Sequence, residues 1–161
     1  MYALRQWSVR NARVLEWVYE YFEGFMMALH PLWILIGYDR IEGPICATER
    51  RVKAVLFDCQ MCGYCVLSQT GMSCPMNCPK ELRNGPCGGV RENGFCEVKP
   101  QMRCVWVDAW EGSGRMRDGS GIQRVQSPLA QGLRGRSAWL REVREKRDLG
   151  FFGTAGQYGG I

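Results

Sequence analysis

Cysteine is the residue type most able to do chemistry in this chain of 161 residues, which contains nine cysteines. Clustered thiolates either form disulfides or bind soft metals such as iron and zinc, and the redox compartment decides between the two. Eight of the nine lie close together and are the candidate metal ligands: Cys59, Cys62, Cys65, Cys74, Cys78, Cys87, Cys96 and Cys104.

The first three of these cysteines are spaced C-x2-C-x2-C. Thiolates at these intervals wrap around one iron–sulfur cubane, while a fourth ligand comes from elsewhere in the chain. Cys74 and Cys78 each precede a proline, as the distal ligand of ferredoxins does. Eight cysteines form two tetrads, which predicts two 4Fe–4S clusters. The count equally allows one cluster with one four-cysteine zinc site, or two zinc sites.

The remaining reactive residues indicate no catalytic apparatus in the chain. Cys46 stands apart from the cluster and is interpreted as a small buried apolar residue. His30 is the single histidine, lies before a proline at the end of an apolar stretch, and is interpreted as structural. Neither a Ser-His-Asp set nor a phosphate-binding glycine loop is present. We therefore expect no catalytic residue and no organic cofactor site here.

The N-terminal third predicts an amphipathic helix over residues 6–29, with Arg13, Glu16, Glu20 and Glu23 opposite its apolar face. Its apolar residues recur at spacings of three and four: Leu15, Val18, Tyr19, Phe22, Met26 and Leu29. Pro31 is expected to end the helix. A turn is predicted at residues 42–44, a short strand at 52–57, and a short strand or helical turn at 105–110.

Residues 58–104 lack periodicity and are rich in Gly, Pro, Asn and Cys, which predicts loops that metal bonds must stabilise. Ser137 is the predicted N-cap of a short helix over residues 137–148, and residues 150–161 are expected to fray. The predicted fold is therefore a small α+β, loop-rich, metal-stabilised domain with an N-terminal amphipathic helix and a short C-terminal helix. We divide it into a helical segment (1–50), a cysteine-rich metal-binding domain (51–112) and a Gly/Arg-rich extension (113–161).

Charge and hydropathy limit the location and the partners. The net charge is +5, and residues 115–147 carry nine basic and three acidic side chains. This segment reads as a solvated basic tail; the alternative is a zinc-stabilised nucleic-acid-binding module that stacks bases on Trp110 and Trp139. The apolar run 25–37 is too short to span a membrane, and no secretory signal precedes it. We therefore expect a cytoplasmic protein, whose cysteines stay reduced and bind metal.

Four stretches resemble the methylenetetrahydrofolate reductase C-terminal domain family, which includes small cysteine-rich V-type subunits. They are DCQMCGYC (58–65), CPMNCPKELRNGPCGG (74–89), GFCEV (94–98) and CVW (104–106). The resemblance implies that all eight clustered cysteines bind metal. It also implies a flavin-containing TIM-barrel partner that reduces methylenetetrahydrofolate.

On this resemblance we expect an iron–sulfur accessory subunit that docks on the partner and relays electrons to its flavin, from a donor protein that the sequence does not identify. Its folate and flavin chemistry would belong to the partner, so the chain itself would be a non-catalytic subunit of an oxidoreductase. The alternative within the same complex is a zinc-folded structural adaptor. Nucleic-acid binding is the least favoured of the three functions.

Overall fold

The computed structural model describes residues 2–151 and is mostly helical over that range. Six α-helices and three short 3-10 helices follow one another: α1 (Tyr2–Arg10), α2 (Ala12–Ala28), α3 (His30–Ile36), α4 (Tyr38–Phe57), η1 (Pro75–Asn77), α5 (Val105–Ser113), η2 (Gly119–Gln123), η3 (Gln131–Leu133) and α6 (Ala138–Phe151). Pairing of β type in the described residues is confined to two isolated bridges, Val90–Cys96 and Phe95–Arg103. The expected α+β class is therefore wrong in its β part.

Helix α4 replaces both the turn predicted at residues 42–44 and the strand predicted at 52–57. Pro44 lies inside the helix, and residues 52–57 form its last turns. Four buried side chains, spaced three and four residues apart, hold α4 along its length: Cys46, Glu49, Lys53 and Phe57. Packing of this buried face outweighs the local preference of a proline and of β-branched residues.

The helix predicted over residues 6–29 is present as two helices that meet at Asn11. The Asn11 side chain donates a hydrogen bond to the Trp7 carbonyl oxygen at 2.9 Å, at the bend between α1 and α2. The prediction that Pro31 ends the helix is confirmed, since α2 stops at Ala28. Pro31 then occupies the first turn of α3, where its missing N–H costs nothing.

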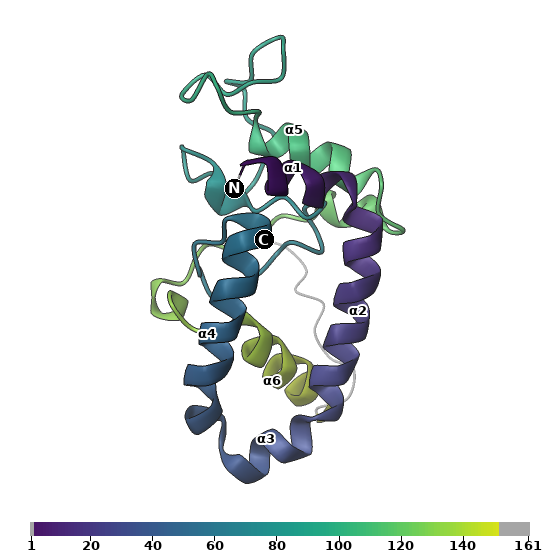
Figure 1. Cartoon of the computed structure of the whole chain (residues 1–161), viewed down its shortest axis with the longest axis vertical. Helices are drawn as coiled ribbons and strands as arrows, with labels where there is room; N and C mark the ends of the chain where they lie inside the picture. Colours follow the sequence, from purple (N-terminus) through teal and green to yellow (C-terminus); the bar gives the residue numbers. More distant parts are fainter. Residues whose placement is uncertain (1, 152–161) are drawn as a thin grey trace.

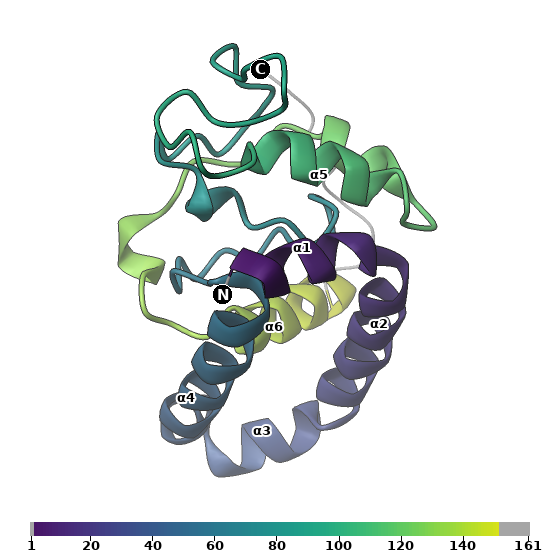
Figure 2. The ribbon, with the colours of Figure 1, turned by 45° about the horizontal axis from the view of Figure 1, so that its top comes forward.

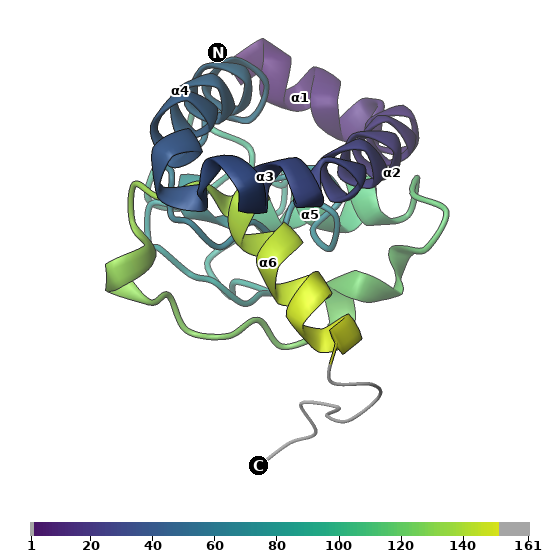
Figure 3. The same ribbon diagram turned by 90° about the horizontal axis from the view of Figure 1, so that it is seen from below.

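The two long helices α2 and α4 form arms that α3 joins at one end, and α6 lies between them (Figure 1). Viewed from below, α6 crosses the opening behind α3 (Figure 3). Its buried Leu140 and Val143 pack with Met26 of α2. The N–H of Leu140 donates to the Ser137 hydroxyl at 3.3 Å, so the predicted cap and short C-terminal helix are confirmed. The fraying predicted for residues 150–161 lies, from residue 152 onward, outside the described residues.

At the other end of the arms, α5 packs against α1 (Figure 2). Helix α5 confirms the helical alternative for residues 105–110, and its Val105 and Ala109 are buried. Residues 58–104 run between α4 and α5 and contain η1 as their only helix, which agrees with the predicted loop-rich segment. Within residues 2–151, every helix is too short or too polar for a bilayer span.

Candidate metal centre

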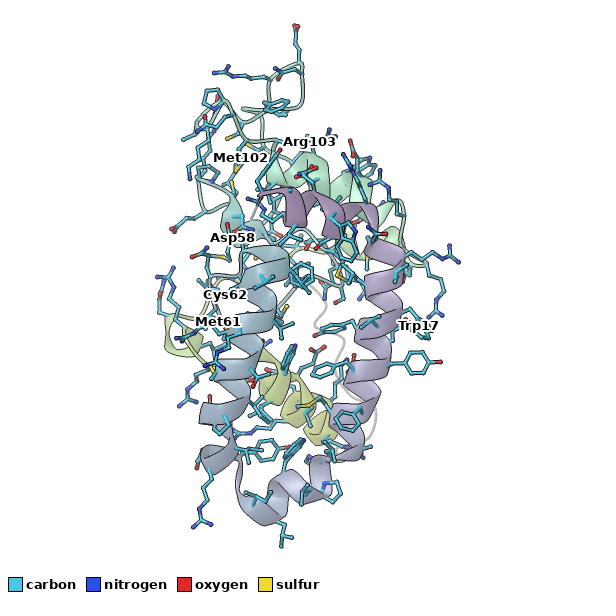
Figure 4. The ribbon with its side chains drawn as sticks, in the orientation of Figure 1. Trp17, Asp58, Met61, Cys62, Met102 and Arg103 are labelled. Carbon is cyan, nitrogen blue, oxygen red and sulfur yellow. The ribbon has the colours of Figure 1, made fainter. Side chains whose placement is uncertain are left out.

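The end of α4 delivers the first cysteine of the cluster into a tight bend. Asp58 terminates the helix in the left-handed conformation, with φ 53°, and Met61 and Gly63 also have positive φ angles of 47° and 74°. A Cβ at Gly63 would lie 2.1 Å from the Leu133 carbonyl oxygen, so only glycine allows η3 to approach this closely. Figure 4 shows Met61 and Cys62 alongside α4, where the chain has turned back.

Four of the predicted ligands line one small cavity of about 20 Å³: Cys59, Cys62, Cys65 and Cys74. Their spacing is C-x2-C-x2-C-x8-C, so the loop 66–73 returns a fourth thiol to the three that open the motif. This arrangement places Cys74 on the same cavity as the first three cysteines. The spacing alone left that position open between several later cysteines.

Apolar side chains enclose one side of this cavity. Buried Phe57, Leu67 and Met72 form a cluster against which Cys65 and Cys74 pack. Burial raises the pKa of the Cys59 thiol to about 11, although the Met61 N–H donates to its sulfur at 3.4 Å and opposes the shift. Burial likewise raises the pKa of Cys74. Cys59 and Cys74 therefore hold their protons at neutral pH until a cation displaces them.

A buried ion pair lines the same cavity. Glu49 and Lys53 are 1% and 3% exposed, and the Lys53 Nζ lies 2.6 Å from the Glu49 Oε1. Burial on its own lowers the pKa of Lys53, but the proximity of Cys65 and the hydrogen-bonded carboxylate of Glu49 outweigh it and hold this pKa above its ordinary value. Sequence reasoning missed this pair, because charges four residues apart on a helix are usually a solvated surface pair.

The other four predicted ligands fall into two pairs. Cys78 and Cys96 pack together beside Val105. Cys87 and Cys104 line a separate cavity of about 420 Å³, whose walls include Trp106 and Trp110. Across residues 2–151, no three Cys, His, Asp or Glu side chains gather closely enough to hold a single metal ion.

Cys46 and His30, which the sequence analysis excluded from the ligand set, do not line the cavity of the first four cysteines. Cys46 is buried on α4, as predicted. Its thiol lies 3.0 Å from the Gly135 carbonyl oxygen, and this contact links α4 to Gly135. The Nδ1 of His30 lies 2.7 Å from the Tyr38 hydroxyl, so the histidine links the start of α3 to the start of α4. That contact agrees with the structural role predicted for His30.

A second feature of functional interest is an apolar surface on the outside of α2 and α3, which we name the outer stripe. Trp17 and Tyr21 are 56% and 65% exposed, and their ring centroids lie 4.5 Å apart. Trp17 points away from the rest of the protein (Figure 4). The exposed residues of the outer stripe are Val14, Trp17, Val18, Tyr21, Phe25, Leu32, Ile34, Leu35 and Ile36.

The acidic side chains of α2 were expected to face solvent opposite the core, but they pair with the C-terminal segment. Glu16 accepts a hydrogen bond from the Arg117 backbone N–H at 2.7 Å, and Glu20 pairs with the Arg117 guanidinium at 2.9 Å. Glu23 pairs with Lys146. The acids therefore occupy one flank of α2, and the face turned to solvent is apolar. Val18, predicted on the core face, lies on that exposed face.

The basic C-terminal segment is engaged within the protein. The Arg141 guanidinium lies 4.1 Å from the ring centroid of Tyr64, and Arg147 donates to the Met27 carbonyl oxygen at 3.0 Å. Trp139, which the nucleic-acid alternative required as a stacking surface, packs against Phe22 with centroids 4.5 Å apart. These contacts leave Trp110 as the exposed member of the proposed stacking pair.

Comparison with known proteins gives one family. The model of the methylene-tetrahydrofolate reductase C-terminal family matches residues 38–131, which contain all eight clustered cysteines and helices α4 and α5. Searches of curated proteins and of solved structures give no significant match. The matched segment covers more than half of the sequence, so the chain belongs to the methylene-tetrahydrofolate reductase C-terminal family.

Proposed function

We propose that this chain is the iron–sulfur accessory subunit of a methylenetetrahydrofolate reductase, and that it relays electrons to the flavin of a catalytic partner. The observation that carries the proposal is the convergence of Cys59, Cys62, Cys65 and Cys74 on one cavity in a member of this family. A 4Fe–4S cluster held there supplies single-electron chemistry.

The side chains around the cavity suit such a group. Four thiols on one cavity provide the type and number of ligands that an iron–sulfur cluster requires. They would have to draw together around it, because no three of them in the described structure are close enough to hold a single metal ion. Phe57, Leu67 and Met72 keep water from one side of the site. Lys53 places a buried positive charge beside ligands that become anionic when they bind metal.

The outer stripe is the proposed docking surface for the flavin-containing subunit. Exposed apolar patches rimmed by polar residues are typical of protein interfaces, and tryptophan and tyrosine are the residues that anchor them best. Leu15 on the inner side of α2 packs on the cluster of side chains that also contacts Cys65 and Cys74. Helix α2 and this cluster of side chains therefore lie between the cavity and the outer stripe.

The second four cysteines carry the remaining metal. Cys78, Cys87, Cys96 and Cys104 belong to the part of the domain with the least regular structure, which favours metal bonds as structural links. They would hold a second cluster or a zinc ion. If zinc fills both sets, the chain is the structural adaptor of the same complex.

The test is anaerobic purification followed by analysis of iron, sulfide and zinc per chain, with absorption spectra. We expect iron and sulfide for at least one 4Fe–4S cluster, lost in Cys62→Ser and retained in Cys46→Ser. The flavin of the co-purified partner should then be reduced by a low-potential donor faster with the intact chain than with Cys62→Ser. Zinc without iron would establish the adaptor, and equal flavin reduction with both chains would refute the relay.

A further inference from the structure

The buried pair of Glu49 and Lys53 has no evident purpose in the packing of α4 alone. Removing two opposite charges from water costs desolvation energy that their attraction often fails to recover, so a buried ion pair is weak evidence for stability. Both side chains nevertheless line the cavity of the first four cysteines.

Glu49 and Lys53 contact different parts of the protein. The Glu49 Oε2 accepts from the Ser137 hydroxyl at 2.7 Å, which ties the carboxylate to the start of α6. Lys53 lies one turn further along α4, toward the cysteines, and its carbonyl oxygen accepts the Cys59 N–H at 3.3 Å. Its ammonium group lies 5.1 Å from the Trp139 ring centroid, and its side chain lines the same cavity as Cys59 and Cys65. The positive member of the pair is therefore the one nearer to the cysteines along α4.

We infer that the buried positive charge of Lys53 makes a cluster held in this cavity, the first cluster, easier to reduce. Glu49 holds the Lys53 side chain in place, and its negative charge limits the effect of Lys53 on the reduction potential. The inference rests on the proposed function, because it requires a redox-active cluster on Cys59, Cys62, Cys65 and Cys74. One electron from a low-potential donor protein adds one negative charge to the site, and passing it to the partner's flavin removes that charge. A fixed positive charge nearby stabilises the form with the added electron.

Lys53 and Arg136 are both cations on the cavity, and burial makes the Lys53 charge the more effective of the two. The Arg136 side chain is 62% exposed, so water and salt screen its charge. The Lys53 side chain is 4% exposed and lies in the dry interior, where a charge acts more strongly on its neighbours. The Ser137 hydroxyl and the backbone N–H of Trp139, 2.7 and 3.4 Å from Oε2, keep the Glu49 carboxylate in place beneath it.

The test is a potentiometric titration of the anaerobically purified chain, followed by absorption and electron paramagnetic resonance. We expect Lys53→Met to lower the midpoint potential of the first cluster, and Glu49→Gln to raise it by leaving the ammonium unopposed. Arg51→Gln, which removes an exposed charge from the same helix, should leave the potential near that of the wild type. Opposite shifts from the two buried positions are the signature of a charge effect, which a purely structural role would not produce.

The double variant Glu49→Gln/Lys53→Met covers the case in which a single variant fails to fold, since it keeps the buried volume without an unpaired charge. Its potential should lie below that of the wild type, because the positive charge is the one nearer to the cysteines along α4. Equal potentials in all loaded variants, or shifts of the same sign from Lys53→Met and Glu49→Gln, would overturn the inference. A wild-type chain that contains no iron and sulfide would instead refute the proposed function, so the two failures are distinguishable.

Discussion

The substitution Trp17→Ala provides the most direct test of the docking surface, because it removes a large exposed ring without touching the core. The ring is 56% exposed, so a partner that covers it would bury roughly 100 Å² of the 150–250 Å² that an aromatic side chain offers. At about 25 cal/mol per Å² that area contributes about 2.5 kcal/mol. Ordering of side chains at the interface offsets part of this, which leaves about 2 kcal/mol, or roughly a 30-fold weaker Kd.

The assay is a calorimetric titration of the chain with the flavin-containing reductase subunit, performed for the wild type, Trp17→Ala and Trp110→Ala. Trp110 is the matched control, since it is 65% exposed but lies on α5, away from the outer stripe. We expect the loss of affinity for Trp17→Ala alone, with thermal unfolding of the free chain unchanged within about 2 °C. A Kd within threefold of the wild type for Trp17→Ala would refute docking through the outer stripe, and a loss confined to Trp110→Ala would move the interface to α5.

Three further outcomes are expected. Stripping the metal should increase amide exchange across residues 59–104 while α2 stays protected, since the loops have little other regular structure; unchanged protection would contradict metal-dependent folding. Cys62→Ser should lose one metal site per chain and Cys46→Ser none, and equal losses would contradict the ligand assignment. Ser137→Ala removes both the cap of α6 and a buried hydrogen bond to Glu49, which predicts a loss of about 2–4 kcal/mol in the urea-derived free energy of unfolding. The exposed Ser68→Ala is its control, and a loss below about 0.5 kcal/mol for Ser137→Ala would contradict the role of that hydrogen bond.

Local signals in the sequence predicted the helices that depend on them. The apolar spacing of residues 6–29 and the serine at 137 both predicted helices that the structure contains. The segment 52–57 was assigned as a strand because its valines favour extended chain in isolation. That preference is small, and it is overridden where Lys53 and Phe57 face the interior of a long helix.

The clustering of the cysteines could be predicted from the sequence, but which of them share one cavity could not. Cysteine density and C-x2-C-x2-C spacing are properties of the chain, and they indicate thiolate chemistry without coordinates. The choice of Cys74 as the fourth residue of the first set depends on the path of loop 66–73 and on the left-handed turns at Asp58 and Met61. The burial of the Glu49–Lys53 pair could not be predicted from the sequence either, because it depends on the packing of α6 on α4.

Helix α2 shows how one misread face changes the functional interpretation. An amphipathic pattern with acids on one side is normally oriented with those acids in water. Here Glu16, Glu20 and Glu23 bind Arg117 and Lys146, so the excess positive charge of the C-terminal segment is partly neutralised within the protein. The same contacts reduce the basic surface available to nucleic acid and turn Trp17 and Tyr21 outward. Exposed aromatic rings beside internally paired charges are typical of protein interfaces, and together with the family of this chain they are the reason why we propose a reductase subunit as the partner of the outer stripe.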